Sequence, residues 1–153
     1  MFYALVHYPA VDTVSINQLR RSYDPQIDLI DPHITLVFPV REAIGEQRLV
    51  SHIEKILRGW KPFPIHLQGL QRSWDNYLFL LIQEGKMEVI RLHDELYTGI
   101  LAKHLRDALP FVPHITLGSF AEDEDRLLTS LRRSGENAVR LPEYCGSATL
   151  GEG

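Results

Sequence analysis

The chain has 153 residues, of which 44% are hydrophobic and 24% are charged. This length and composition predict a single globular domain with a buried core and exclude a disordered chain. The formal net charge of −4 disfavours a protein that holds duplex DNA through many phosphate contacts. A small phosphorylated substrate, or one RNA end held locally, is compatible with this charge.

The first half of the chain alternates strand and helix patterns. Apolar and aromatic residues run from Phe2 to Tyr8, and Ser15 is a candidate N-cap for a helix that ends at Tyr23. A helical stripe of apolar residues then precedes two apolar runs joined by a polar turn. In chain order we expect a strand, a helix, a strand, a helix and a two-stranded hairpin over residues 2–8, 15–23, 33–38, 45–60, 63–70 and 77–83.

The second half repeats this plan. Val89, Leu92 and Leu96 recur at helical spacing. We expect a helix, a strand, a helix and one or two closing strands over residues 87–105, 114–120, 122–133 and 137–150. The order of elements predicts an α+β fold in which residues 1–153 form one domain, with two similar halves around a shared core.

Cys145 is the single cysteine, so the chain cannot form an internal disulfide, and a reducing cytoplasmic location is expected. The apolar run at the start is short and lacks a preceding positive segment, which favours a first strand over a signal peptide. No run approaches the roughly 20 apolar residues that span a bilayer. A self-contained domain of modest charge is expected to be a monomer without membrane partners.

The sequence PHITL occurs twice, at residues 32–36 and 113–117, about half a chain length apart. Side chains alternate between the two faces of a strand, so the histidine and threonine of each copy share one face while the isoleucine and leucine share the other. The four polar residues are His33, Thr35, His114 and Thr116. A lone histidine on a strand is usually structural, but the exact repetition favours two halves of one site.

Two histidines and two threonines can together catalyse attack at phosphorus. Histidine has the unperturbed pKa nearest neutrality, so one neutral and one protonated ring form a general base and a general acid. Threonine hydroxyls can donate hydrogen bonds to phosphoryl oxygens that gain charge in the transition state. In-line attack needs groups on opposite sides of the phosphorus, and two related halves would supply one histidine to each side.

The two PHITL segments resemble the paired His-x-Thr signatures of the two-histidine phosphoesterases, which include RNA 2′,3′-cyclic phosphodiesterases, also called 2′-5′ RNA ligases. The segment "YDP...IDPHITLVFPV" is similar to the approach to the first signature, and "FPIHLQGLQRSWDNYLFLLI" to the hairpin between the signatures. The resemblance extends from Phe2 to about Phe120. The signature is specific for the superfamily but not for a substrate.

The resemblance implies a bilobal α+β domain with pseudo-two-fold symmetry, antiparallel sheets lining a central cleft and helices outside. It implies that His33 and His114 are the catalytic pair and that Thr35 and Thr116 bind the phosphate. No cofactor or metal is implied. The implied reaction is hydrolysis of a 2′,3′-cyclic phosphate on a nucleotide or an RNA end, with His114 as the base and His33 as the acid.

One departure from the family pattern bears on the substrate. Some relatives carry a basic residue shortly after the second signature, whereas here "HITLGSFAEDED" supplies four acids. This disfavours long RNA and gives no support to ligation as the natural reaction. Two alternatives stay open: hydrolysis of another small phosphodiester, such as a cyclic ADP-ribose phosphate or a 2′-5′ oligonucleotide, and a binding module without turnover.

Further residues are weaker candidates. Trp74 in the hairpin turn is the best candidate for stacking on a base, and His7 could face the cleft from the first strand. His52, His93 and His104 fall in helical stretches and are expected at the surface or its boundary. The sequence "LHDEL" lacks the second histidine of a zinc-binding helix, so a metal site is not expected.

Overall fold

The computed structural model describes residues 2–41, 44–119 and 144–145. Six strands, three α-helices and one 3-10 helix lie in these ranges. They are β1 (Phe2–His7), α1 (Thr13–Tyr23), β2 (Ile34–Arg41), α2 (Glu46–Leu57), β3 (Pro64–Arg72), β4 (Tyr77–Glu84), α3 (Lys86–Leu96), η2 (Gly99–His104), β5 (His114–Ser119) and β6 (Tyr144–Cys145).

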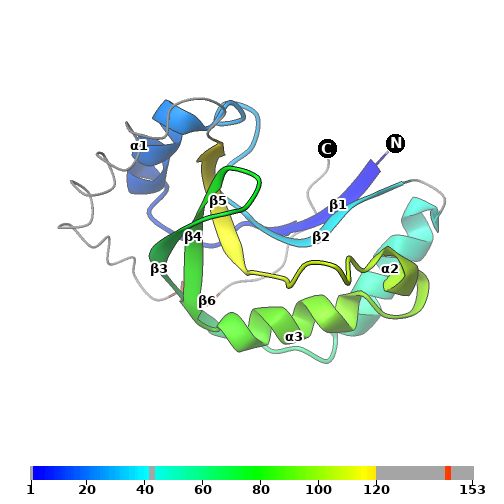
Figure 1. The fold of residues 1–153 in the computed structure, drawn as a ribbon. Helices are drawn as coiled ribbons and strands as arrows, with labels where there is room; N and C mark the ends of the chain where they lie inside the picture. Colours follow the sequence, from blue (N-terminus) through cyan, green and yellow to red (C-terminus); the bar gives the residue numbers. More distant parts are fainter. Residues whose placement is uncertain (1, 42–43, 120–143, 146–153) are drawn as a thin grey trace.

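The strands form one antiparallel sheet in the order β1-β2-β5-β4-β3-β6 (Figure 1). Strand β1 pairs with β2, and β3 and β4 form the predicted hairpin. The hairpin joins the first pair through β5, which lies between β4 and β2. The sheet with its helices is of the expected α+β class, and the two strands that begin in PHITL are neighbours at its centre.

The two central strands are related by a local two-fold axis. Ile34 of β2 pairs directly with Ile115 of β5, and these are equivalent positions of the repeated sequence. Because the strands are antiparallel, a two-fold axis between these two residues exchanges one PHITL segment for the other. The repeat in the sequence is therefore a repeat in space.

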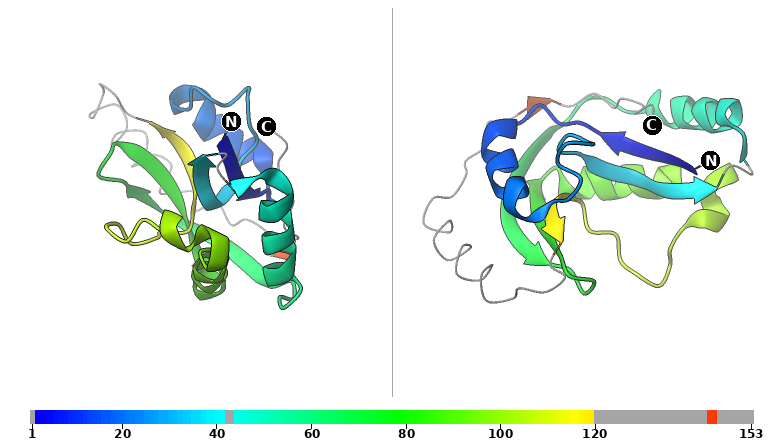
Figure 2. Two further views of the ribbon diagram at one scale, coloured as in Figure 1. Left: turned by 90° about the vertical axis from the view of Figure 1, so that its right-hand side faces the viewer. Right: turned by 90° about the horizontal axis from the view of Figure 1, so that it is seen from above.

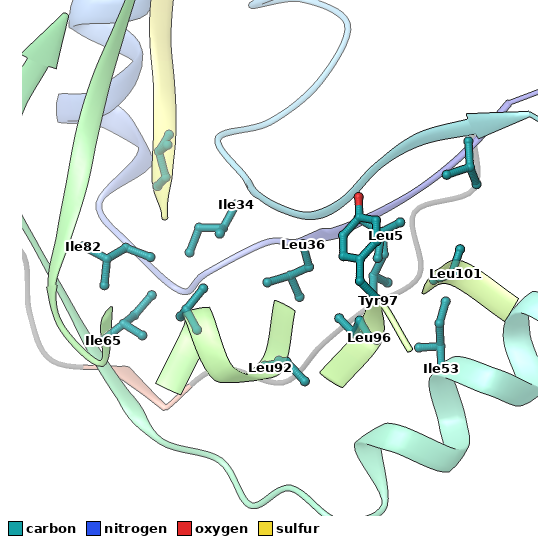
Figure 3. Close-up of a cluster of buried hydrophobic side chains, with 14 of the residues drawn as sticks. Leu5, Ile34, Leu36, Ile53, Ile65, Ile82, Leu92, Leu96, Tyr97 and Leu101 are labelled. Carbon is teal, nitrogen blue, oxygen red and sulfur yellow. The ribbon is translucent and has the colours of Figure 1, made fainter. Parts of the chain in front are cut away.

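The core lies between the sheet and the helices α2 and α3. Figure 3 shows apolar side chains of β1, β2, β3 and β4 beside those of α3, with Ile53 of α2 and Leu101 of η2 at the far end. The most deeply buried members include Leu5, Ile16, Ile34, Val37, Ile53, Leu67, Ile82, Leu96, Leu101, Ile115 and Leu117. Both isoleucines of the repeat belong to this core, so the histidines and threonines beside them must face the opposite side of the sheet.

Helix α1 lies at the other end of the sheet from α2, as the right-hand view of Figure 2 shows. Its N-cap is Asp12, three residues before the predicted Ser15, and the Asp12 carboxylate accepts hydrogen bonds from the backbone N–H groups of Val14 and Ser15. At its other end, Tyr23 packs directly on Gly118 of β5, where a Cβ atom would come within 2.4 Å of Tyr23 Cβ. Glycine is therefore required for this approach of α1 to β5.

One predicted helix differs from the structure in its extent. The helix expected over 87–105 ends at Leu96, because Thr98 adopts an extended backbone conformation, and the chain continues as η2 from Gly99, whose φ is 53°. The Thr98 hydroxyl, which donates to the Glu95 carbonyl at 2.7 Å, caps the break. The helix expected over 122–133 lies outside the described residues, as do all but two residues of the expected closing strands.

Strand β2 contains an irregularity that redirects one side chain. Its register against β1 shifts between the pairs Val6–Thr35 and Leu5–Val37, so β2 has an extra residue there. Leu36 and Val37 are consequently both buried although they are consecutive. After this bulge Phe38 faces the same side of the sheet as Thr35, which simple alternation would not predict.

No helix in the part of the chain that the structure describes is long and apolar enough to cross a membrane.

Candidate active site

Each PHITL segment begins with a buried proline and then alternates between exposed and buried side chains. The prolines precede the strands, where the missing N–H removes no ladder hydrogen bond. In both copies the isoleucine and leucine are buried, while the histidine and threonine are partly exposed. This pattern confirms that the two polar residues of each copy share a face and the two apolar residues share the other.

The pairing of Ile34 with Ile115 brings the four polar residues together. His33 precedes and Thr35 follows Ile34, while His114 precedes and Thr116 follows Ile115. Because the two strands are antiparallel, His33 and Thr116 lie on one side of the Ile34–Ile115 pair, and Thr35 and His114 lie on the other. The two histidines therefore lie diagonally across the axis, one on each side of any group bound on it.

The two histidine rings are held by equivalent hydrogen bonds. His33 Nδ1 lies 2.8 Å from the carbonyl oxygen of Asp31, and His114 Nδ1 lies 2.6 Å from that of Val112. A carbonyl oxygen only accepts, so Nδ1 carries the proton in both rings. Nε2 is then the nitrogen left to take or give a proton, and it is the same nitrogen in both halves.

The surroundings of the two rings break the symmetry. His114 stacks on Phe79 with ring centroids 3.5 Å apart, whereas His33 has only a tilted contact with Tyr8 at 6.1 Å. Burial lowers the pKa of His114 below its ordinary value of 6.5, and the neighbouring His33 lowers it further. The Val112 carbonyl and Asp75 act in the opposite direction. His114 is therefore mostly neutral at pH 7.

A cleft of about 680 Å³ extends from His114 and Thr116. One wall is the tip of the β3–β4 hairpin, and the other is the segment 105–112 that leads into β5. Phe38 lines the cleft because the bulge in β2 turns it to this face. The volume suits a ligand of nucleotide size, since small-molecule sites typically occupy about 300–1,000 Å³.

The two weaker candidates lie in different places. Trp74 lines the cleft at the hairpin tip and is 78% exposed. The prediction that His7 faces the cleft is wrong, because His7 pairs with Ile34 and lies with Leu36 and Val89 in a small cavity on the core side of the sheet. It shares the face of Leu5, two residues earlier, which is buried in the core.

One cleft residue was missed by the sequence reasoning. His93 was expected near the surface, but it is only 4% exposed and lines the cleft from α3. Its ring is stacked on Phe111. Its spacing could have predicted its burial, because His93 directly follows the core residue Leu92 and lies three positions before the core residue Leu96.

Within residues 2–41, 44–119 and 144–145, no three or more His, Cys, Asp or Glu side chains are grouped so that they could hold a metal ion.

An antiparallel sheet whose two central strands each bring a His-x-Thr pair to one two-fold axis defines the class of two-histidine phosphoesterases. Comparison with known families agrees: residues 8–141 match the family described as "2'-5' RNA ligase superfamily". The chain belongs to this superfamily, which confirms the resemblance expected from the two PHITL segments.

Several bacterial proteins named "Putative phosphoesterase" are similar to the chain. The one from Halalkalibacterium halodurans is 31% identical over 136 residues, covering 83% of this chain and 77% of its own. The one from Geobacillus kaustophilus is 32% identical over 123 residues, covering 77% and 69%. The one from Bacillus licheniformis is 28% identical over 128 residues, covering 82% and 75%.

Proposed function

We propose that the protein is a metal-independent phosphoesterase that hydrolyses a 2′,3′-cyclic phosphate on a nucleotide or an RNA end. The observation that carries the proposal is the pairing of Ile34 with Ile115, which sets two His-x-Thr pairs around one axis. Both histidines keep Nε2 for proton transfer, since Nδ1 of each is bonded to a backbone carbonyl. Membership of a phosphoesterase superfamily supports an enzyme over a binding module.

In the proposed mechanism His114 is the general base and His33 the general acid. Nε2 of His114 takes a proton from water as the water oxygen attacks phosphorus. The bond from phosphorus to the ribose 3′-oxygen breaks, and Nε2 of protonated His33 gives that oxygen its proton. The product is a 2′-phosphate with a free 3′-hydroxyl, and one proton returns from His114 to His33 through solvent. The lowered pKa of His114 suits a base that must be neutral near pH 7.

The threonines are proposed to bind the phosphate. Thr35 follows Ile34 and Thr116 follows Ile115 on antiparallel strands, so a phosphate on the axis between this pair would have one hydroxyl on each side. Hydroxyl donors aimed at the non-bridging oxygens stabilise the charge that develops there in the transition state. In-line attack then leaves the two histidines at the positions of the attacking water and the departing oxygen.

Trp74 is proposed to stack on the base of the substrate. It lines the cleft and is exposed, so a planar ring can reach its face. Stacking of a base on an aromatic side chain contributes about 1–3 kcal/mol. We expect Trp74→Ala to raise KM by about 5- to 150-fold with a small change in kcat, measured with a nucleoside 2′,3′-cyclic phosphate. A change in kcat alone would contradict a role in binding.

Two other functions use the same site. The cleft could accept another small phosphodiester, such as a cyclic ADP-ribose phosphate or a 2′-5′ oligonucleotide, since the His-x-Thr pairs contact only the phosphate. A binding module would also hold the phosphate, but it would have no need of two histidines with equivalent hydrogen bonds. For this reason we place hydrolysis first.

Turnover in EDTA tests the proposal. The purified protein is incubated with each nucleoside 2′,3′-cyclic phosphate in excess EDTA, and products are separated by chromatography. We expect a nucleoside 2′-phosphate at an unchanged rate, because protein side chains carry out both proton transfers. Loss of turnover in EDTA would indicate a metal-dependent phosphodiesterase. Saturable binding without product would indicate a binding module.

A further inference from the structure

His93 lines the cleft together with His114, and the proposed mechanism does not use it. It lies on α3 with only 4% of its surface exposed. Its ring is parallel to that of Phe111, with centroids 3.8 Å apart and an interplanar angle of 7°. A second, tilted contact joins it to Tyr97 at 4.7 Å. The ring therefore connects helix α3 with the segment that leads into β5.

Phe111 belongs to the segment that orients His114. The next residue, Val112, provides the carbonyl that accepts the hydrogen bond from His114 Nδ1 at 2.6 Å. The carbonyl of Pro113 then accepts a hydrogen bond from the backbone N–H of Ile82 on β4, at 3.3 Å. The segment is thus fastened to the sheet on one side of Val112 and to His93 on the other. Phe111 also makes an edge-on contact with Phe38, with centroids 6.4 Å apart.

We propose that His93 is a positioning residue for His114, acting through its stack on Phe111 and the carbonyl of Val112. The expected effect on kcat rests on the proposed function. The expected effect on the orientation and pKa of His114 does not. The stack holds the Val112 carbonyl where it selects the Nδ1–H tautomer and aims Nε2 at the axis. His93 itself does not transfer a proton in this scheme.

The expected effect follows from the geometry. A displacement of about 1 Å at a catalytic group can cost 10²-fold in rate. Without the stack, Phe111 loses its partner on α3, so the Val112 carbonyl can move and water can reach the His114 ring. The pKa of His114 is lowered chiefly by burial, so it would rise toward its ordinary value. The charged groups concerned are His33 and Asp75 beside His114, and Asp94 beside His93.

Three variants separate positioning from other roles. His93→Phe keeps a stacking ring without a ring nitrogen, whereas His93→Leu keeps an apolar side chain without a stack. Phe111→Leu removes the other ring of the same stack, and it replaces His93→Leu as the test if His93→Leu does not fold. The matched control is His52→Leu, because His52 on α2 bonds the Leu96 carbonyl and does not line the cleft.

Two readouts are measured on each folded variant: kcat and KM with a nucleoside 2′,3′-cyclic phosphate, and the NMR titration of His114 without substrate. We expect His93→Leu and Phe111→Leu to lower kcat about 10- to 100-fold, with KM little changed and the His114 pKa raised. We expect the kcat of His93→Phe and of His52→Leu to stay within about three-fold of the wild-type value. We expect the pKa of His114 in both variants to match that in the wild type.

The outcomes are distinguishable. If His93→Phe is as damaging as His93→Leu, a ring nitrogen of His93 acts directly and the positioning role is overturned. The positioning role is also overturned if neither His93→Leu nor Phe111→Leu changes the pKa of His114 in the NMR titration. If the wild type turns over no cyclic phosphate, the proposed function fails, while the titration of His114 still decides the structural part of the inference.

Discussion

Replacing either His33 or His114 with alanine is expected to lower kcat/KM by about 10²- to 10⁴-fold, the usual contribution of a general acid or base. The two rings occupy equivalent positions across the axis between Ile34 and Ile115 and present the same nitrogen, so each loss removes one of the two proton transfers. The measurement is kcat/KM for a nucleoside 2′,3′-cyclic phosphate in each variant.

The double variant and a matched control refine this result. Groups that act as a unit are non-additive, so His33→Ala combined with His114→Ala is expected to be little worse than the poorer single variant. His52→Ala removes a partly buried histidine outside the cleft and is expected to keep the wild-type rate. A single variant that retained full activity would remove that histidine from the mechanism.

The pH dependence has a definite sign on its acidic side. His114 must be neutral to act as the base, and burial lowers its pKa below 6.5. The rate is therefore expected to be fully developed near pH 7 and to fall as pH drops through the lowered pKa. The other limb of the bell-shaped profile reports the acid, the role proposed for His33. Rates across pH 4–10, with ionic strength held constant, check this expectation; a profile without an acidic limb would contradict it.

The largest effect on stability is expected at Arg20. This arginine on α1 is 1% exposed, and its Nε donates to Asp24 Oδ2 at 2.7 Å. Its other nitrogens donate to Asn17 Oδ1 at 3.0 Å and to the carbonyl of Ile30 at 2.7 Å. Arg20→Met leaves the largely buried Asp24 carboxylate without its cation, which typically costs about 3–5 kcal/mol.

Urea unfolding measures this loss as a change in the free energy of unfolding. Arg21→Met is the matched control, because Arg21 is adjacent and exposed, and its change is expected to stay within about 0.5 kcal/mol. Arg20→Met combined with Asp24→Leu removes both charges and is expected to recover part of the loss. A cost below about 1 kcal/mol for Arg20→Met would show that the buried pair contributes little.

Arg20 also bears on the site, because it binds the carbonyl of Ile30. The next residue, Asp31, provides the carbonyl that accepts from His33 Nδ1. The two catalytic candidates are thus supported in the same way, each by a carbonyl two residues earlier in a segment that a buried side chain anchors. Neither Arg20 nor His93 was a candidate from the sequence, since the contacts that connect them to the site, with Ile30 and with Phe111, form only in the folded chain.

Strand periodicity was sufficient to predict the polar face of the repeat but not the other cleft residues. His33 and Thr35 share a face because alternation needs no information beyond neighbouring residues. Phe38 does not obey that alternation, because a bulge against β1 inserts an extra residue. For His7, alternation relates it correctly to Leu5, but only the pairing of β1 with β2 decides that both face the core.

The sequence by itself was enough to predict the class of this protein: its two identical segments resemble a family signature, and their alternating polar and apolar residues predict the strands and the faces of the sheet by local rules. The tertiary structure decided what lies around them. The pairing of Ile34 with Ile115 sets the axis, burial lowers the pKa of His114, and the stack of His93 on Phe111 connects α3 to the site. These properties depend on residues distant in sequence, and a pKa or a ring contact exists only once the chain has brought such residues together.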